Sequence, residues 1–139
     1  MKIIIDSNVL FSALIKDSHT RRLILEYDRQ FLFPDFIFRE LENHKEELLK
    51  KTGLNSSSFE QLLGIILRKV QIVPDEKIKP YKNEALRIVE QIDPDDAVFV
   101  ACALAYPNSI IWSDDKALKR TGLVLTTKEI TTTKYLASR

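Results

Sequence analysis

The chain has 139 residues, of which 45% are hydrophobic and 29% are charged, and its formal net charge is +1. We expect a single domain spanning residues 1–139, because a chain of this length buries enough surface to fold without a disulfide or a metal. The near-neutral charge excludes a strongly cationic coat for nucleic acid. Any such binding must use a local patch or a metal ion.

The chain shows no sign of secretion or membrane insertion. Only three apolar residues lie between Lys2 and Asp6, so no secretory signal is visible. The longest apolar run, Ala97 to Tyr106, has ten residues, too few to cross a bilayer. The lone Cys102 cannot form an internal disulfide, and its apolar neighbours indicate a small buried hydrophobe. We therefore expect a cytoplasmic protein with no membrane association.

Short apolar strands alternate with helical patterns along the chain. The expected elements are a strand at 3–5, helices at 7–15 and 20–27, a strand at 31–33, helices at 35–51 and 57–69, a strand at 70–73, helices at 80–92 and 93–106, a strand at 110–112, a helix at 114–120, a strand at 123–125 and a terminal helix or loose tail at 128–136.

Two boundaries have specific signals. The helix over 35–51 is expected to end near Gly53, since glycine often follows a helix end. Ser57 and Glu60 fit a capping box for the next helix. Because residues 59–67 are apolar beyond one stripe, this helix packs either on the core alone or also on a partner subunit.

Strands made of three to five mostly β-branched or apolar residues are typical of a parallel sheet covered by helices on both faces. The expected fold class is therefore α/β, a three-layer α/β/α sandwich. In such a sheet, ligands bind beyond the carboxyl ends of the strands.

Acidic residues from four separate segments are expected at that carboxyl edge, where helix starts also lie. They are Asp6 after the first strand, Glu40 one turn into the helix after the second, Asp93, Asp95 and Asp96 at a helix start, and Asp114 and Asp115 after the fourth strand. Each acid taken alone is also explained as a helix cap, a turn residue or a solvated side chain. Together they repel one another unless a cation neutralises them.

The cation that suits several carboxylates is Mg²⁺ or Mn²⁺, which prefer oxygen ligands. Such ions polarise a phosphodiester and activate water without a nucleophilic side chain. No alternative chemistry is evident: His19 and His44 are isolated, Cys102 has no neighbouring base, and there is no glycine-rich phosphate loop.

Four motifs resemble the PIN domain family of metal-dependent ribonucleases, which includes VapC-type toxins of toxin–antitoxin pairs. They are Ile5-Asp6-Ser7-Asn8-Val9-Leu10, Phe38-Arg39-Glu40-Leu41, Asp96-Ala97-Val98-Phe99-Val100-Ala101-Cys102-Ala103 and Trp112-Ser113-Asp114-Asp115-Lys116. The resemblance spans essentially the whole chain. It implies a five-stranded parallel sheet in the order 3-2-1-4-5.

The resemblance also implies the roles of individual residues. The catalytic and metal-binding acids would be Asp6, Glu40, Asp96 and Asp115, with Asn8 and Ser113 as polar supports. Asp93 and Asp95 crowd Asp96, and Asp114 stands beside Asp115, so either cluster offers more than one ligand. The implied partners are an RNA substrate, a small antitoxin protein and a second copy of the chain in a homodimer.

The function expected on these grounds is a Mg²⁺- or Mn²⁺-dependent endoribonuclease. One alternative is a non-catalytic PIN-like module for RNA binding or assembly, with a vestigial site. Another is a phospho-acceptor domain like a response regulator, which expects paired acids in the first loop where this chain has Ser7-Asn8. Several basic residues could meet phosphates or could form a solvated face: Arg21, Arg22, Lys116, Lys119 and Arg120.

Overall fold

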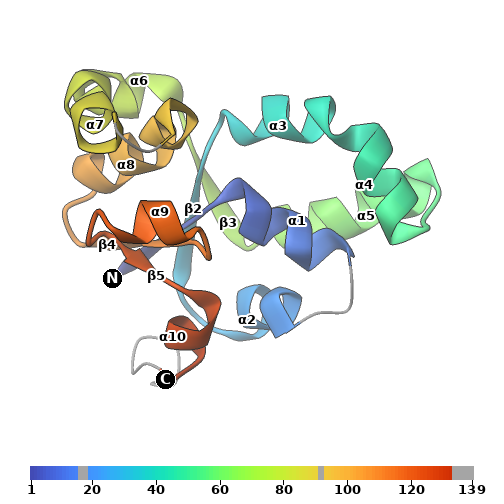
Figure 1. Cartoon of the computed structure of the whole chain (residues 1–139). Helices are drawn as coiled ribbons and strands as arrows, with labels where there is room; N and C mark the ends of the chain where they lie inside the picture. Colours follow the sequence, from blue (N-terminus) through green and yellow to red (C-terminus); the bar gives the residue numbers. More distant parts are fainter. Residues whose placement is uncertain (16–18, 91–92, 133–139) are drawn as a thin grey trace.

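The computed structural model describes residues 1–15, 19–90 and 93–132. Its five strands form one parallel sheet in the order β3-β2-β1-β4-β5, which confirms the expected order (Figure 1). The strands are β1 (Lys2–Ile5), β2 (Gln30–Pro34), β3 (Val70–Val73), β4 (Ser109–Trp112) and β5 (Val124–Leu125). A response-regulator-type sheet has the order 2-1-3-4-5, so the sheet excludes that alternative.

Helices cover both faces of the sheet, as expected for a three-layer sandwich (Figure 1). The first face carries α1 (Ser7–Ile15), α2 (His19–Glu26), α3 (Ile37–Asn43), α4 (Lys45–Thr52), α5 (Ser56–Leu67) and α10 (Thr127–Thr132). The opposite face carries α6 (Asp75–Ile78), α7 (Lys82–Val89), α8 (Ala97–Ala105) and α9 (Lys116–Lys119). Two 3₁₀ turns, η1 (Lys79–Tyr81) and η2 (Pro94–Asp96), precede α7 and α8.

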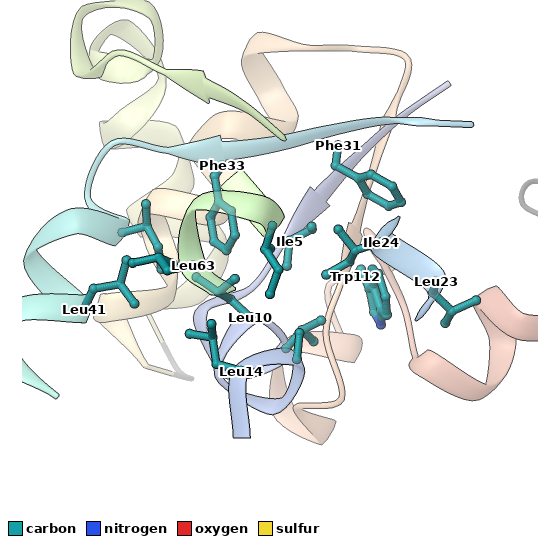
Figure 2. Packing of buried hydrophobic residues seen from close by; sticks show 14 of the residues in the cluster. Ile5, Leu10, Leu14, Leu23, Ile24, Phe31, Phe33, Leu41, Leu63 and Trp112 are labelled. Atoms are coloured by element: carbon teal, nitrogen blue, oxygen red, sulfur yellow. The ribbon is translucent and has the colours of Figure 1, made fainter. Parts of the chain in front are cut away.

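The strand period of two divides the apolar residues of β1 between two cores. Ile3 and Ile5 pack with the helices of the first face, whereas Ile4 packs with those of the second. Figure 2 shows Ile5 beside Phe33 and Leu10 in the first core. Because β1 is the middle strand and both of its faces are buried, the position and direction of the residue after Ile5 are fixed.

The expected helix over 35–51 is two helices. The chain leaves helical geometry at His44 (φ −107°, ψ 8°), which separates α3 from α4. The sequence pattern is continuous through this point and does not predict the break. At the break, the centroid of the His44 ring lies 5.3 Å from that of Phe11 on α1. The predicted end at Gly53 is confirmed, since this residue has φ 69° and terminates α4.

The capping box predicted at Ser57 is wrong. Asn55 is the N-cap of α5, and its side-chain oxygen accepts a hydrogen bond from the Ser58 backbone N–H at 2.8 Å. Helix α5 therefore begins at Ser56, and Ser57 is an exposed residue of its first turn. On the same helix, Phe59, Leu63 and Ile66 are buried and Leu62 and Leu67 pack against the core, whereas Ile65 is 46% exposed and lies outside it.

Two other predicted helices differ from the structure. The helix predicted from residue 80 begins earlier, as α6 at Asp75, and passes through η1 before α7, because Pro80 favours the start of a new turn. The helix predicted from residue 93 begins with η2, and α8 follows it. Residues 91–92 and 133–136 of the predicted helices lie outside the described residues.

The apolar run at 97–106 is a buried core helix. Cys102 on α8 is fully buried, and burial raises the pKa of its thiol to about 12, as expected for a small hydrophobe rather than a nucleophile. Across the residues described here, we find no helix long and apolar enough to cross a membrane.

The cap of α5 gives a test of the local structure. Replacing Asn55 with alanine removes the acceptor for the Ser58 N–H, so we expect the free energy of unfolding to fall by about 1 kcal/mol. The matched control, Ser57→Ala, should lose no stability because its hydroxyl caps nothing. Urea denaturation of both variants measures the difference, and an equal loss in the two would contradict the assignment of the cap.

Candidate functional site

Asp6 stands at the carboxyl end of the middle strand. Its backbone N–H donates to the Trp112 carbonyl of β4 at 3.1 Å, and its own carbonyl accepts from Val9 and Leu10, which begin α1. The residue therefore joins a buried strand to a buried helix. Its side chain is only 5% exposed.

Ser113 connects Asp6 to the loop after β4. The Ser113 hydroxyl donates to Asp6 Oδ2 at 2.6 Å and accepts from the Asp115 backbone N–H at 3.1 Å. Ser113 is itself fully buried, and its N–H donates to the Leu125 carbonyl of β5 at 3.1 Å. One hydroxyl thus fixes the rotation of the Asp6 carboxylate and the start of the Asp115 segment together.

Asn8 supports Asp6 through its backbone rather than its side chain. The Asn8 N–H lies 3.3 Å from Asp6 Oδ1, while the Asn8 side chain is exposed. That side chain helps to line a hollow of about 230 Å³ above Asp6. The hollow, here called the acidic hollow, is lined by Asp6, Asn8, Val9, Ser12, Asp114 and Asp115.

Asp96 is partly buried at the end of η2, next to α8. Burial, together with the charges of the neighbouring carboxylates Asp6, Asp115, Asp93 and Asp95, raises its pKa to about 7. Its Oδ2 atom is buried and has no hydrogen-bond partner. A buried oxygen without a donor is costly for a carboxylate, and a cation or a proton would remove that cost.

The charges of Asp6, Asp96 and Asp115 act on one another. Burial is the main cause that raises the pKa of Asp6, the hydrogen bond from Ser113 opposes it, and the charge of Asp115 raises it further. The charge of Asp6 in turn raises the pKa of Asp96. Three acids from three segments of the chain therefore share one electrostatic neighbourhood.

Asp114 and Asp115 have different hydrogen bonds. Both oxygens of Asp114 accept from Thr127, one from its N–H and one from its hydroxyl, each at 2.7 Å, so this side chain anchors the start of α10. Asp115 uses one oxygen, Oδ1, to accept from the N–H groups of Ala117 and Leu118 as the N-cap of α9. The other oxygen of Asp115, Oδ2, accepts no hydrogen bond from the residues that the structure describes.

Asp93 and Asp95 are exposed, and Asp93 is a cap residue. The Asp93 side chain accepts from the Asp95 N–H at 3.0 Å and caps η2. Their charges reach Asp96, but both side chains are open to solvent. Within this segment, Asp96 is the residue whose carboxylate is withdrawn from water.

Glu40 lies in the first turn of α3, after the carboxyl end of β2, and is partly buried. Its charge is not among those that raise the pKa of Asp6 or Asp96. The structure thus brings Asp6, Asp96 and Asp115 into electrostatic contact.

The chemistry of the acids fits a hard divalent cation. The available donors are all oxygens, since Asn8 and Ser12 line the hollow beside the carboxylates, and the unpartnered Asp96 Oδ2 is a buried position that such an ion would satisfy. In the part of the chain that the structure describes, no three acidic, histidine or cysteine side chains already form a closed ligand set. Movement of a side chain such as Asp115, which is exposed, would be needed to bring three oxygens onto one ion.

One buried polar group near Asp6 was not identified from the sequence. The Ser7 hydroxyl is buried and has no hydrogen-bond partner. Its place directly after Asp6 was the only available signal. Two of the basic residues considered for phosphate have structural partners instead: the Arg21 guanidinium donates to the Ala13 carbonyl at 2.7 Å, and Lys119 pairs with Glu129.

Comparisons with known proteins agree with this architecture. A profile of the PIN domain family matches residues 4–136. The fold is similar to that of a chain in the crystal structure of VapBC2 from Rickettsia felis bound to a DNA fragment from their promoter, with a TM-score of 0.66 and 19% sequence identity, covering 91% of this chain and 97% of that chain. At that identity the likeness shows the fold alone. No curated protein matches the chain in a sequence comparison.

The raised pKa of Asp96 predicts a stability that depends on pH. An acid whose pKa is 3.8 when exposed and about 7 when folded binds more protons in the folded state. Stability without metal therefore falls as the pH rises from about 4 to 7. We expect Asp96→Asn to melt a few degrees above wild type at pH 8 in EDTA, and the gain to vanish near pH 4.

Thermal melts across this pH range measure the effect, with Asp28→Asn, an exposed acid between α2 and β2, as the control. The same pH profile in both variants would mean that Asp96 carries no special cost.

Proposed function

Because the chain belongs to the PIN domain family, we propose that it is an endoribonuclease that hydrolyses RNA phosphodiesters with Mg²⁺ or Mn²⁺ held by its acidic cluster. The observation that carries the proposal is the group of Asp6, Asp96 and Asp115, which lie close enough for their charges to act on one another. Three such acids repel one another when charged, and a divalent cation bound among them would neutralise that repulsion.

Asp6 and Asp96 would hold the principal ion, and Asp115 would complete that site or a second one. When bound, the ion would polarise the phosphodiester and lower the pKa of a water molecule. Ser113 would keep the Asp6 carboxylate in one rotation by donating to Oδ2, which leaves Oδ1 as the oxygen directed away from that bond. Glu40 would bind through water or orient the attacking water.

The protein's own residues also set the protonation of the site. With no cation beside it, Asp96 is partly protonated near neutral pH, since burial and its neighbours raise its pKa to about 7. Metal binding at lower pH must therefore displace a proton from this residue. Activity that depends on this step should rise with pH through the neutral range.

Further partners are proposed on family grounds. The similar structure is that of VapBC2 bound to a DNA fragment from their promoter, and on this ground a small antitoxin is proposed as a partner of this chain, with the protein acting in the cytoplasm. A homodimer is also proposed. The exposed Ile65 on α5 is compatible with contact to another protein chain.

A non-catalytic RNA-binding or assembly module is the second candidate. The observation that favours it is that the acids do not form a closed ligand set among the described residues. Calorimetric titration with Mn²⁺ separates the two candidates. A nuclease should take up Mn²⁺ in a manner that depends on Asp6 and Asp96, and a module with a vestigial site should not.

The proposed function predicts a sharp effect of a single isosteric change. Asp6→Asn keeps the size of the side chain but removes its charge, so we expect Mn²⁺-dependent cleavage of RNA to fall by at least about 100-fold. Ser113→Ala should cost about 10- to 100-fold, because it loosens a ligand without removing it. Gel analysis of fluorescent RNA measures both, with Asp28→Asn as the control.

Sequencing of the RNA ends would identify the target at the same time. Cleavage by Asp6→Asn at the wild-type rate, in preparations free of contaminating nuclease, would overturn the proposed function.

A further inference from the structure

A second hollow continues the acidic hollow along α1. It lies between α1 and α4, which pack side by side (Figure 1), and has a volume of about 300 Å³. The two hollows share Asn8 and Ser12 as lining residues. The second, here called the α1–α4 groove, is lined by Asn8, Phe11, Ser12, Ile15, His44, Glu47, Leu48 and Lys51. A ligand in the acidic hollow can therefore extend into the groove without leaving the surface.

One face of α1 forms a wall of this groove. Asn8, Phe11, Ser12 and Ile15 follow the spacing i, i+3, i+4 and i+7, which places them on one side of a helix. The opposite side of α1 is buried in the first core. This wall thus begins beside Asp6 and leads away from it along the helix.

Two aromatic rings stand in the groove. The ring centroids of Phe11 and His44 are 5.3 Å apart, with the planes tilted by 53°. The side chain of His44 is 43% exposed, and Phe11 is partly exposed. Rings of this kind, including histidine, are the surfaces on which unpaired bases of single-stranded RNA stack.

The charges in the groove favour a neutral ligand over a phosphate. The Glu47 carboxylate lies 2.8 Å from Lys51 Nζ and 3.6 Å from His44 Nδ1. The cation of Lys51 is therefore matched by an anion in the same groove. A flat group with polar edges fits this setting, because it meets ring faces together with donors and acceptors.

We propose that the α1–α4 groove is a nucleobase subsite, in which one base of a single-stranded RNA packs against the tilted ring pair of Phe11 and His44, stacking on one ring and meeting the other at an angle, while the adjoining phosphodiester lies in the acidic hollow. This inference rests on the proposed function, since it takes RNA to be the substrate. In this arrangement, residues of α1 together with His44 select the base next to the cleaved bond. The acids act on the phosphodiester backbone of the RNA, which is the same for every base sequence.

The first test measures binding without cleavage. In an Asp6→Asn background with Mn²⁺, fluorescence anisotropy would report the affinity for fluorescein-labelled hexamers of rA, rC, rG and rU. We expect Phe11→Leu and His44→Leu each to weaken the binding of at least one hexamer by about 5- to 100-fold, because each keeps an apolar side chain but removes a ring. His44→Phe keeps a ring at this position, so its RNA affinity should be close to that of the parent.

The matched control is His19→Leu, which removes an exposed histidine of α2 that does not line the groove. Its RNA affinity should equal that of the parent. Thermal melting of each variant reports whether it is folded.

The second test changes the RNA and compares wild type with one variant. A hexamer bound well by wild type is prepared with one base removed at each position in turn. We expect one position, next to the cleaved bond, to account for most of the loss in kcat/KM. At that position the His44→Leu variant should no longer distinguish the abasic from the complete RNA.

Several outcomes would overturn the subsite. One is full RNA affinity in both ring variants. If these variants keep full RNA affinity but no longer bind a co-purifying protein, the groove is a protein-docking surface. Another is an equal loss at every abasic position. Intact Asp6-dependent cleavage with these results would reject the subsite and keep the proposed function. Ring-dependent RNA binding by a wild-type protein that cleaves nothing would reject the proposed function and keep the subsite.

Discussion

The structure depends on one constraint, the burial of a carboxylate at the end of its middle strand. The Asp6 side chain is 5% exposed, and the Ser113 hydroxyl donates to it from the neighbouring strand's end. A buried charge needs hydrogen bonds or a counter-ion, and here burial still raises the pKa of Asp6 in spite of the bond from Ser113. The burial of Asp6 is therefore only partly compensated within the chain, and the proposed cation would offset the remaining cost.

The order of the strands turns this local cost into a site. Because β1 lies between β2 and β4, the loop after β4 meets the end of β1, and α8 begins close by after the crossover from β3. Asp115 and Asp96 are thereby brought near Asp6 from segments about 90 to 110 residues away along the chain. Each of the three would be an ordinary cap or turn residue if the strands had another order.

Asp114 and Asp115 are neighbours of the same residue type, but their hydrogen bonds give them different roles. Asp114 gives both oxygens to Thr127, and that threonine hydroxyl also accepts from the buried Trp112 ring N–H at 2.8 Å. Asp115 keeps an oxygen outside the cap of α9. The pair therefore combines an anchor for the loop with a side chain that can serve the acidic hollow, and a change at Asp114 would disturb Asp115 through the backbone.

Much of this protein is determined by the sequence alone. Apolar strands too short and too uniform for a half-exposed sheet, such as Ile3-Ile4-Ile5, predict helices on both faces and a ligand edge at the carboxyl ends of the strands. The strand order was implied by the resemblance to the PIN domain family, and the structure confirms it. Local caps were less certain, because Asn55 and Ser57 both carry acceptors and only the path of the chain selects between them.

The tertiary structure decided what depends on contacts between distant residues. The break at His44 and the contact of its ring with Phe11 on α1 are seen only in the folded chain, because the helical pattern of the sequence is continuous through this point. The rise in the pKa of Asp96 comes from burial and from charges on other segments. Sequence identified the acids as a group, whereas only the folded chain determined which of them are withdrawn from water and which remain as caps.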